Sequence, residues 1–237
     1  MAQSPVKESP MSSHNNSPLN PLPPVVAALA VLIIGIEVVF QLGARSGFFG
    51  PGAVGWRLEA VQRYAFSSDI FGWMLSNGRW PLEHVIRFLS YAFIHVSFTQ
   101  ALFAGVMVLA LGKMVGEVFS QVAVLMVFVS GTVIGALAYG LLVETPIPLI
   151  GAFPGAYALI GAFTYLLWLR LGQLGERQTR AFSLIGLLMG IQLVFGLLFG
   201  SQPDWIADLS GFVSGFVLSV FVSPGGLRRM RDRMRHR

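Results

Sequence analysis

The stretch Gly151-Ala-Phe-Pro-Gly-Ala-Tyr-Ala-Leu-Ile-Gly161 is a helix start framed by glycines inside a strongly apolar chain. A bent backbone of small residues at bilayer depth is tolerated where it lines a cavity, because peptide groups that face lipid without partners are costly. The stretch therefore has the character of a membrane site. Its third residue, Phe153, stands where a reactive hydroxyl would be expected, which raises the question of whether the site is catalytic.

The composition predicts an integral membrane protein. Apolar residues make up 54% of the 237 positions and charged residues 11%, against about 25% charged residues in soluble domains. There is no cysteine, which excludes disulfides, thiolate nucleophiles and thiolate metal sites. No cofactor or metal is predicted, because His95 has no other clustered ligands near it in the sequence.

Six apolar segments are each about 20 residues long, enough to cross a hydrocarbon core of about 30 Å. The sequence therefore predicts an all-α bundle of six transmembrane helices. They are placed at 24–44, 99–119, 120–143, 151–172, 179–199 and 204–223. Residues 1–23 are rich in Ser, Pro and Asn and are predicted to form a disordered tail, and residues 224–237 a basic tail.

The distribution of basic residues predicts the orientation. Six of the sixteen Lys and Arg residues fall between Arg228 and Arg237, next to the last apolar segment, so the net charge of +5 indicates topology and not nucleic-acid binding. Arg170, Arg177 and Arg180 fall on the same side. Both termini are therefore expected in the cytoplasm, in a plasma or inner membrane.

The segment from 45 to 98 is too apolar to be a simple linker. Aromatic residues such as Trp56, Trp73 and Trp80 alternate with polar residues and with Pro51 and Pro81. This mixture is typical of short helices that lie in the membrane interface. An ordinary surface loop is the alternative.

Pairs of glycines four residues apart predict close helix packing, because they place two small residues on one helix face. These pairs are Gly131/Gly135, Gly151/Gly155, Gly186/Gly190 and Gly211/Gly215.

Four motifs in order resemble the rhomboid family of intramembrane proteases, over most of residues 80–223. Ile86-Arg-Phe-Leu-Ser-Tyr-Ala-Phe-Ile-His95 is similar to the family's Trp-Arg-x-x-(Ser/Thr)-x-x-Phe-x-His, with Ile86 in place of tryptophan. Leu111-Gly112 and Glu117 resemble the end of the same span. The run Gly151 to Gly161 is similar to the Gly-x-Ser-Gly segment. Asp208 to Gly215 is similar to His-x-x-Gly-x-x-x-Gly, with Gly211 and Gly215 in place.

The resemblance implies which residues would carry the chemistry. The nucleophilic serine falls on Phe153 and the histidine base on Asp208. The family's second-span pattern, His-x-x-x-x-His-x-x-x-Asn, reads His95, Gln100 and Ala104 here. A hydroxyl needs an adjacent base to attack a carbonyl, and donors must hold the oxyanion. We therefore expect these four positions, Phe153, Asp208, Gln100 and Ala104, to be vestigial. Phenylalanine is also expected to plug the water-accessible pocket.

An unrecognised serine site is the alternative. Ser130, Ser210 and Ser214 lie inside predicted spans, but no histidine is near them in the sequence.

Two acids, Glu37 and Asp208, lie within predicted spans, and such residues need partners. Asp208 is expected to be protonated, or to accept hydrogen bonds from Gln100 or Tyr157, or to reach water near the outer mouth. Structural roles are expected for Arg87, as an anchor of the interfacial segment, and for Glu117, paired with Lys113 or a backbone terminus.

Two functions follow from these expectations. The first is a non-proteolytic rhomboid-like protein that binds or regulates transmembrane segments of other membrane proteins. The second is an intramembrane serine endopeptidase with a non-standard site. A transport role is less favoured, because no inverted repeat is found and few polar residues would line a path.

Overall fold

The computed structural model describes residues 22–45, 50–199 and 203–223. Within these residues, six helical segments are long and apolar enough to cross a membrane. The helices are α1 (Pro24–Arg45), α6 (Phe98–Gly116), α7 (Gln121–Leu142), α8 (Phe153–Gln173), α9 (Ser183–Phe199) and α10 (Trp205–Val222). Their ends differ from the predicted ones by at most four residues. The largest difference is at α9, where Gln178–Phe182 forms a separate 3-10 turn, η4. The predicted all-α fold is confirmed.

Local sequence explains where the helices begin. The side chains of Ser97 and Ser120 accept hydrogen bonds from the backbone N–H groups of Gln100 (3.3 Å) and Ala123 (3.2 Å) and so cap α6 and α7. The second residue of α8 is Pro154. Proline lacks a backbone N–H, and in the first turn of a helix this costs no hydrogen bond, because N–H groups there have no partner within the helix. The chain reverses just before it at Gly151, with φ of 105°.

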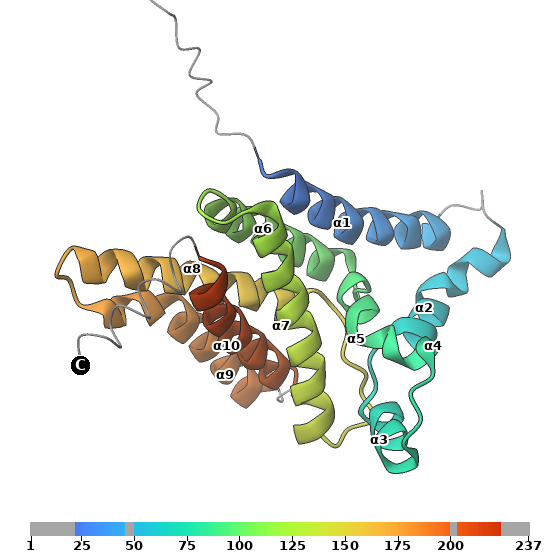
Figure 1. Cartoon of the computed structure of the whole chain (residues 1–237). Helices are drawn as coiled ribbons and strands as arrows, with labels where there is room; N and C mark the ends of the chain where they lie inside the picture. Colours follow the sequence, from blue (N-terminus) through green and yellow to red (C-terminus); the bar gives the residue numbers. More distant parts are fainter. Residues whose placement is uncertain (1–21, 46–49, 200–202, 224–237) are drawn as a thin grey trace, which may run out of the picture.

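Helix α8 lies at the centre of the bundle, packed against α10, α7 and α6 (Figure 1). The close approach of α8 and α10 depends on glycine. A Cβ atom added at Gly211 would overlap the backbone of Pro154, and one added at Gly215 would overlap the backbone of Ala158. On α7, a Cβ at Gly131 would strike Ala158 as well. These contacts match the packing predicted from the glycine pairs.

Two of the predicted glycine pairs do not pack as expected. Gly151 precedes α8 and has a positive φ, so it shares no helix face with Gly155. The second pair is on α9. A Cβ at Gly186 or Gly190 on α9 would meet no atom within 4 Å. Only 12% of the segment Gln178–Leu198 is buried, against 56% of α8. The prediction for this pair is wrong because glycine spacing permits a close approach but does not supply a neighbour. Helix α9 is the most loosely held of the six spans.

Short helices build the segment between α1 and α6, as predicted. They are η2 (Pro51–Gly55), α2 (Trp56–Tyr64), α3 (Ser68–Asn77), α4 (Leu82–Val85), α5 (Arg87–Ser90) and η3 (Tyr91–Phe93). Phe66, Phe71 and Phe88 form a second core with Tyr139 and Val143 at the end of α7. This interfacial segment is therefore docked on the bundle beside α7 (Figure 1).

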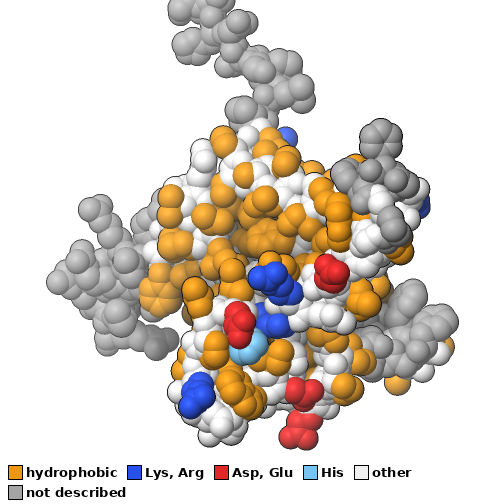
Figure 2. Space-filling view, turned by 90° about the vertical axis from the view of Figure 1, so that its right-hand side faces the viewer, with side chains coloured by type: hydrophobic (Ala, Val, Ile, Leu, Met, Phe, Trp, Pro, Cys, Tyr) orange, Lys and Arg blue, Asp and Glu red, His pale blue; other side chains and the backbone are white. Residues whose placement is uncertain are grey.

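Polar and apolar side chains are separated on the face that carries α1 and the interfacial segment. Figure 2 shows apolar side chains over the upper part of this face, whereas Arg, Asp, Glu and His side chains gather below them. Large apolar residues are exposed on the spans, for example Val31 (69%) on α1 and Phe103 (64%) on α6. Such surfaces suit a lipid environment.

The predicted tails fall largely outside the described residues. Of the segment 1–23, only Leu22 and Pro23 are described. Pro23 lies against Gly116 at the end of α6, where an added Cβ would overlap its ring. The basic tail 224–237 is entirely outside the described residues, so both assignments stay predictions.

Candidate functional site

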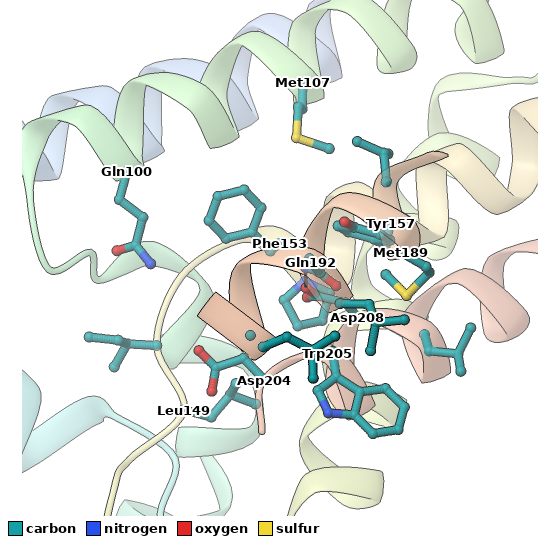
Figure 3. A pocket seen from close by; sticks show the side chains of 17 residues that line it. Gln100, Met107, Leu149, Phe153, Tyr157, Met189, Gln192, Asp204, Trp205 and Asp208 are labelled. Carbon is teal, nitrogen blue, oxygen red and sulfur yellow. Dashed lines mark hydrogen bonds between the residues drawn. The ribbon is translucent and has the colours of Figure 1, made fainter. Parts of the chain in front are cut away.

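A cavity of about 800 Å³ lies where α8 and α10 begin, between α6, α8, α9 and α10. Phe153, Gln100 and Asp208 all line it (Figure 3). Three of the four expected vestigial positions are thus brought together from three helices. The fourth, Ala104, is completely buried within α6 and is not part of the cavity wall.

Phe153 does not plug the cavity as expected. It is half-buried and forms part of the wall, together with Met107 and Tyr157 (Figure 3). Leu188, Met189 and Leu193 of α9 form a further part of the wall. The cavity is lined mainly by apolar side chains.

The segment that leads into α8 is held by two parts of the interfacial segment, the stretch from Tyr91 to His95 and Phe66. The N–H of Gly151 donates to the carbonyl of Tyr91 (3.0 Å), and the N–H of Ala152 donates to Nε2 of His95 (3.3 Å). Phe66 and Leu149 exchange both backbone hydrogen bonds (3.2 and 2.8 Å). The helix start is therefore fixed by backbone and imidazole contacts, none of which needs a serine at residue 153.

His95 is a buried structural histidine. Burial lowers its pKa from the ordinary value of 6.5 to about 4, Arg57 acts in the same direction and Glu37 opposes it. The imidazole is therefore neutral at pH 7 and can accept the hydrogen bond of Ala152 through Nε2. Because Nε2 is used in this way, it is not available as a base for a hydroxyl.

Asp208 has a different partner from those expected. The residue is 4% exposed, and its Oδ2 accepts a hydrogen bond from Nε2 of Gln192 on α9 (2.9 Å). Gln100 turns instead to its own helix start, where Oε1 accepts from the N–H of Val96 (2.7 Å). The unpaired N–H groups of a helix start need such acceptors, which explains why Gln100 does not reach Asp208.

Three further polar residues were missed by the sequence analysis. Gln192 is the only polar side chain of α9 beyond its first residue, and this isolation was the available signal. Asp204 directly precedes α10, lies one turn from Asp208, and its Oδ1 is buried without a hydrogen-bond partner. Burial raises the pKa of Asp204 above its ordinary value. The third is Arg57, described below.

The serines inside the spans are engaged elsewhere. Ser130 and Ser210 donate to the carbonyls of Val127 (2.9 Å) and Ile206 (2.7 Å) of their own helices. Ser214 donates to the hydroxyl of Ser130 (3.2 Å). None of the three lines the cavity, so the described residues do not place a serine hydroxyl beside a base there.

Glu37 is neutralised by a residue of the interfacial segment. Its carboxylate is 1% exposed and pairs with both terminal nitrogens of Arg57 (2.7 and 2.9 Å). Gln41 adds a hydrogen bond of 2.8 Å. Arg57 also donates to the carbonyl of His95, so one guanidinium joins α1, α2 and the turn that supports α8.

Two of the retained family-like residues, Arg87 and Gly161, contact neighbouring elements closely. Arg87 donates to the carbonyls of Ala65 and Gln62 (both 2.9 Å), which ties the end of α2 to α5. A Cβ added at Gly161 would overlap the backbone of Phe212 on α10. Glu117 directly follows α6, and its pairing with Lys113 stays a prediction. In the described ranges, no three His, Asp or Glu side chains gather as a metal site would require.

Acid is expected to destabilise the protein through His95. The unfolded imidazole, with its ordinary pKa of 6.5, takes up a proton at a higher pH than the folded one, whose pKa is about 4. Its contribution is therefore complete above pH 6.5 and is lost as the pH falls toward 4. At about 1.4 kcal/mol per pH unit, the loss of unfolding free energy is on the order of 3 kcal/mol.

The measurement is unfolding in detergent micelles at neutral pH and at about pH 5. A His95→Gln variant keeps an acceptor for Ala152 but cannot titrate, and should lack this acid-sensitive component. Equal acid sensitivity in the two proteins would contradict the assignment.

Comparison with known proteins agrees with this arrangement. The family model described as the Rhomboid domain matches residues 82–225. The chain belongs to the rhomboid family. The matched region begins in the interfacial segment and includes every helix that lines the cavity. A search of curated proteins found no match. The rhomboid domain together with the six apolar helices makes this an integral protein of a lipid bilayer.

Proposed function

We propose that this rhomboid-family protein does not cleave peptide bonds and instead binds transmembrane segments of other membrane proteins. One observation carries the first half of the proposal. Phe153, the first residue of α8, lines the cavity at the position where the family has its nucleophile. Asp208, which also lines the cavity, accepts a hydrogen bond from Gln192. A phenyl ring cannot attack a carbonyl, and a nucleophile without an adjacent base is weak.

The shape and lining of the cavity support the second half. Its walls are mainly apolar and come from α6, α8, α9 and α10. Helix α9 forms one side, and few residues of the apolar segment Gln178–Leu198 are buried. An apolar helix entering from the lipid would exchange lipid contacts for close packing, the interaction that drives association of helices in membranes.

The orientation belongs to the same proposal. Pro24, Val222 and the turn between α8 and α9 lie at one end of the bundle, and the cavity lies toward the other. Arg170, Arg177 and Arg180 mark the first end as cytoplasmic. We place the cavity at the outer side of a plasma or inner membrane.

The test is photo-crosslinking in the native membrane from residue 153. A photoreactive phenylalanine at Phe153 is expected to capture another membrane protein, with the crosslink mapping to that protein's transmembrane segment. The matched control is Phe103 on α6, which is 64% exposed and does not line the cavity. Capture from residue 153 should exceed capture from residue 103 several-fold.

Two results would overturn the proposal. Capture of lipid alone, or only of α8 and α10 of the same chain, would remove the binding function. Labelling of the purified protein by a serine-directed fluorophosphonate, abolished by substitution of one serine, would establish the protease instead.

A further inference from the structure

Two buried acceptor oxygens beside the cavity have no hydrogen-bond partner among the described residues, and they lie near a buried carboxylate. Asp208 is 4% exposed, and the hydrogen bond that its carboxylate accepts within the described residues comes from a neutral amide, that of Gln192. Oε1 of the same Gln192 and Oδ1 of Asp204 are both buried without a hydrogen-bond partner. These oxygens come from α9, from α10 and from the residue that precedes α10. Figure 3 shows the three side chains around one part of the cavity.

No cation of the described chain compensates them. The residues that line the cavity include two aspartates and two glutamines but no Lys, Arg or His. A buried carboxylate is strongly disfavoured unless it is paired, and a buried acceptor without a hydrogen bond is also unfavourable. The contrast with Glu37 is direct, because that carboxylate receives two hydrogen bonds from the guanidinium of Arg57. The lining of the cavity therefore supplies the acidic residues of an ion pair but no basic residue to pair with them.

We infer that the cavity recognises a basic side chain, Lys or Arg, on the transmembrane segment that it binds. This inference rests on the proposed function and names the chemistry of its client. Asp208 lies one turn into α10, so the basic residue must lie within about one helical turn of the same membrane surface. Its apolar stem runs along the cavity wall while its N–H groups reach the carboxylates, as long basic side chains do near membrane surfaces.

The donor count favours a cation over a neutral polar residue. A lysine ammonium has three donors and an arginine guanidinium five, enough for the Asp208 carboxylate and for the unpartnered oxygens of Asp204 and Gln192. A serine or threonine hydroxyl has one donor and would leave the charge unbalanced. A segment carrying Glu at this depth would place like charges together and be rejected.

The experiment uses the full chain in phosphatidylcholine vesicles with labelled single-span peptides, and measures binding by energy transfer. The peptides share one apolar span and differ at a single position one turn from its end, which holds Lys, Leu or Glu. The Lys peptide is expected to bind about tenfold more tightly than the Leu peptide, since close charge pairs couple by at least this factor. The Glu peptide should bind most weakly.

Two variants locate the effect. Asp208→Asn keeps an acceptor for Gln192 but removes the charge, and should bring the Lys and Leu peptides to nearly equal affinity. Glu144→Gln removes one negative charge at the same end of the bundle, from an exposed residue just beyond α7 that does not line the cavity. It should leave the Lys preference unchanged. Should Asp208→Asn fail to fold, Asp204→Asn, which also removes a cavity charge, is expected to reduce the preference.

The outcomes separate this inference from the proposed function. Equal binding of Lys and Leu peptides to the unaltered protein would refute the recognition of a basic residue while leaving helix binding intact. The same conclusion would follow if Glu144→Gln removed the preference as fully as Asp208→Asn does. If none of the three peptides bound, the proposed function itself would fail.

Discussion

The Arg57→Met variant is expected to lose about 3–5 kcal/mol of unfolding free energy, the usual effect of removing one partner of a buried ion pair. Glu37 is 1% exposed within α1, and Arg57 is its only cationic partner among the described residues. Without the guanidinium, the carboxylate would be left in an apolar span with only the amide of Gln41. The measurement is chemical unfolding in detergent micelles.

Two comparisons make this prediction specific. A Glu37→Leu, Arg57→Met double variant removes both charges and should recover most of the lost stability, because apolar replacements of an ion pair are often neutral. Arg180→Met breaks an exposed pair with Glu176, whose side chains are 67% and 50% exposed, and should change stability by less than about 1 kcal/mol. A double variant as unstable as Arg57→Met would contradict the explanation.

The Gly215→Val variant is expected to be destabilised by about 3 kcal/mol or more, at the upper end of the range for overpacked cores. A Cβ at residue 215 would overlap backbone atoms of Ala158, including its carbonyl oxygen. Backbone atoms cannot move aside as a flexible side chain can, so α10 would have to separate from α8. The variant should therefore lose unfolding free energy, and the cavity lined by α8 and α10 should change shape at the same time.

Gly190→Val is the matched control for this prediction. The same substitution on α9 meets no atom within 4 Å, so its effect should stay within about 1 kcal/mol, the scale of helix propensity. Similar losses in both variants would show that α8 and α10 do not depend on the close approach at Gly215.

The membrane fold was predictable because its signals are local. Length and apolarity define a span without reference to other parts of the chain, which is why the helix ends lie so close to the expected ones. The motifs around Phe153 and Asp208 also placed both residues at one site, since their order along the chain is that of a known family. The structure confirms that they line one cavity.

The pairings across the fold were not predictable from these signals. Glu37 required a partner, but nothing in the local sequence indicates that Arg57 folds back from the interfacial segment to reach it. The role of Gln192 was not predictable, because a single amide in an apolar helix forms no repeating pattern that would indicate its partner. The empty surroundings of Gly186 and Gly190 show the same limit, since glycine spacing is local and the presence of a neighbouring helix is not.

The paired backbone hydrogen bonds between Phe66 and Leu149 give the interfacial segment a mechanical connection to the cavity. Leu149 is two residues before Gly151, and Arg57 contacts His95, which in turn holds Ala152. A displacement of the interfacial segment at the membrane surface therefore pulls on the first turn of α8. The interfacial segment and the start of α8 therefore form one hydrogen-bonded unit, and neither can move by itself without breaking one of these contacts.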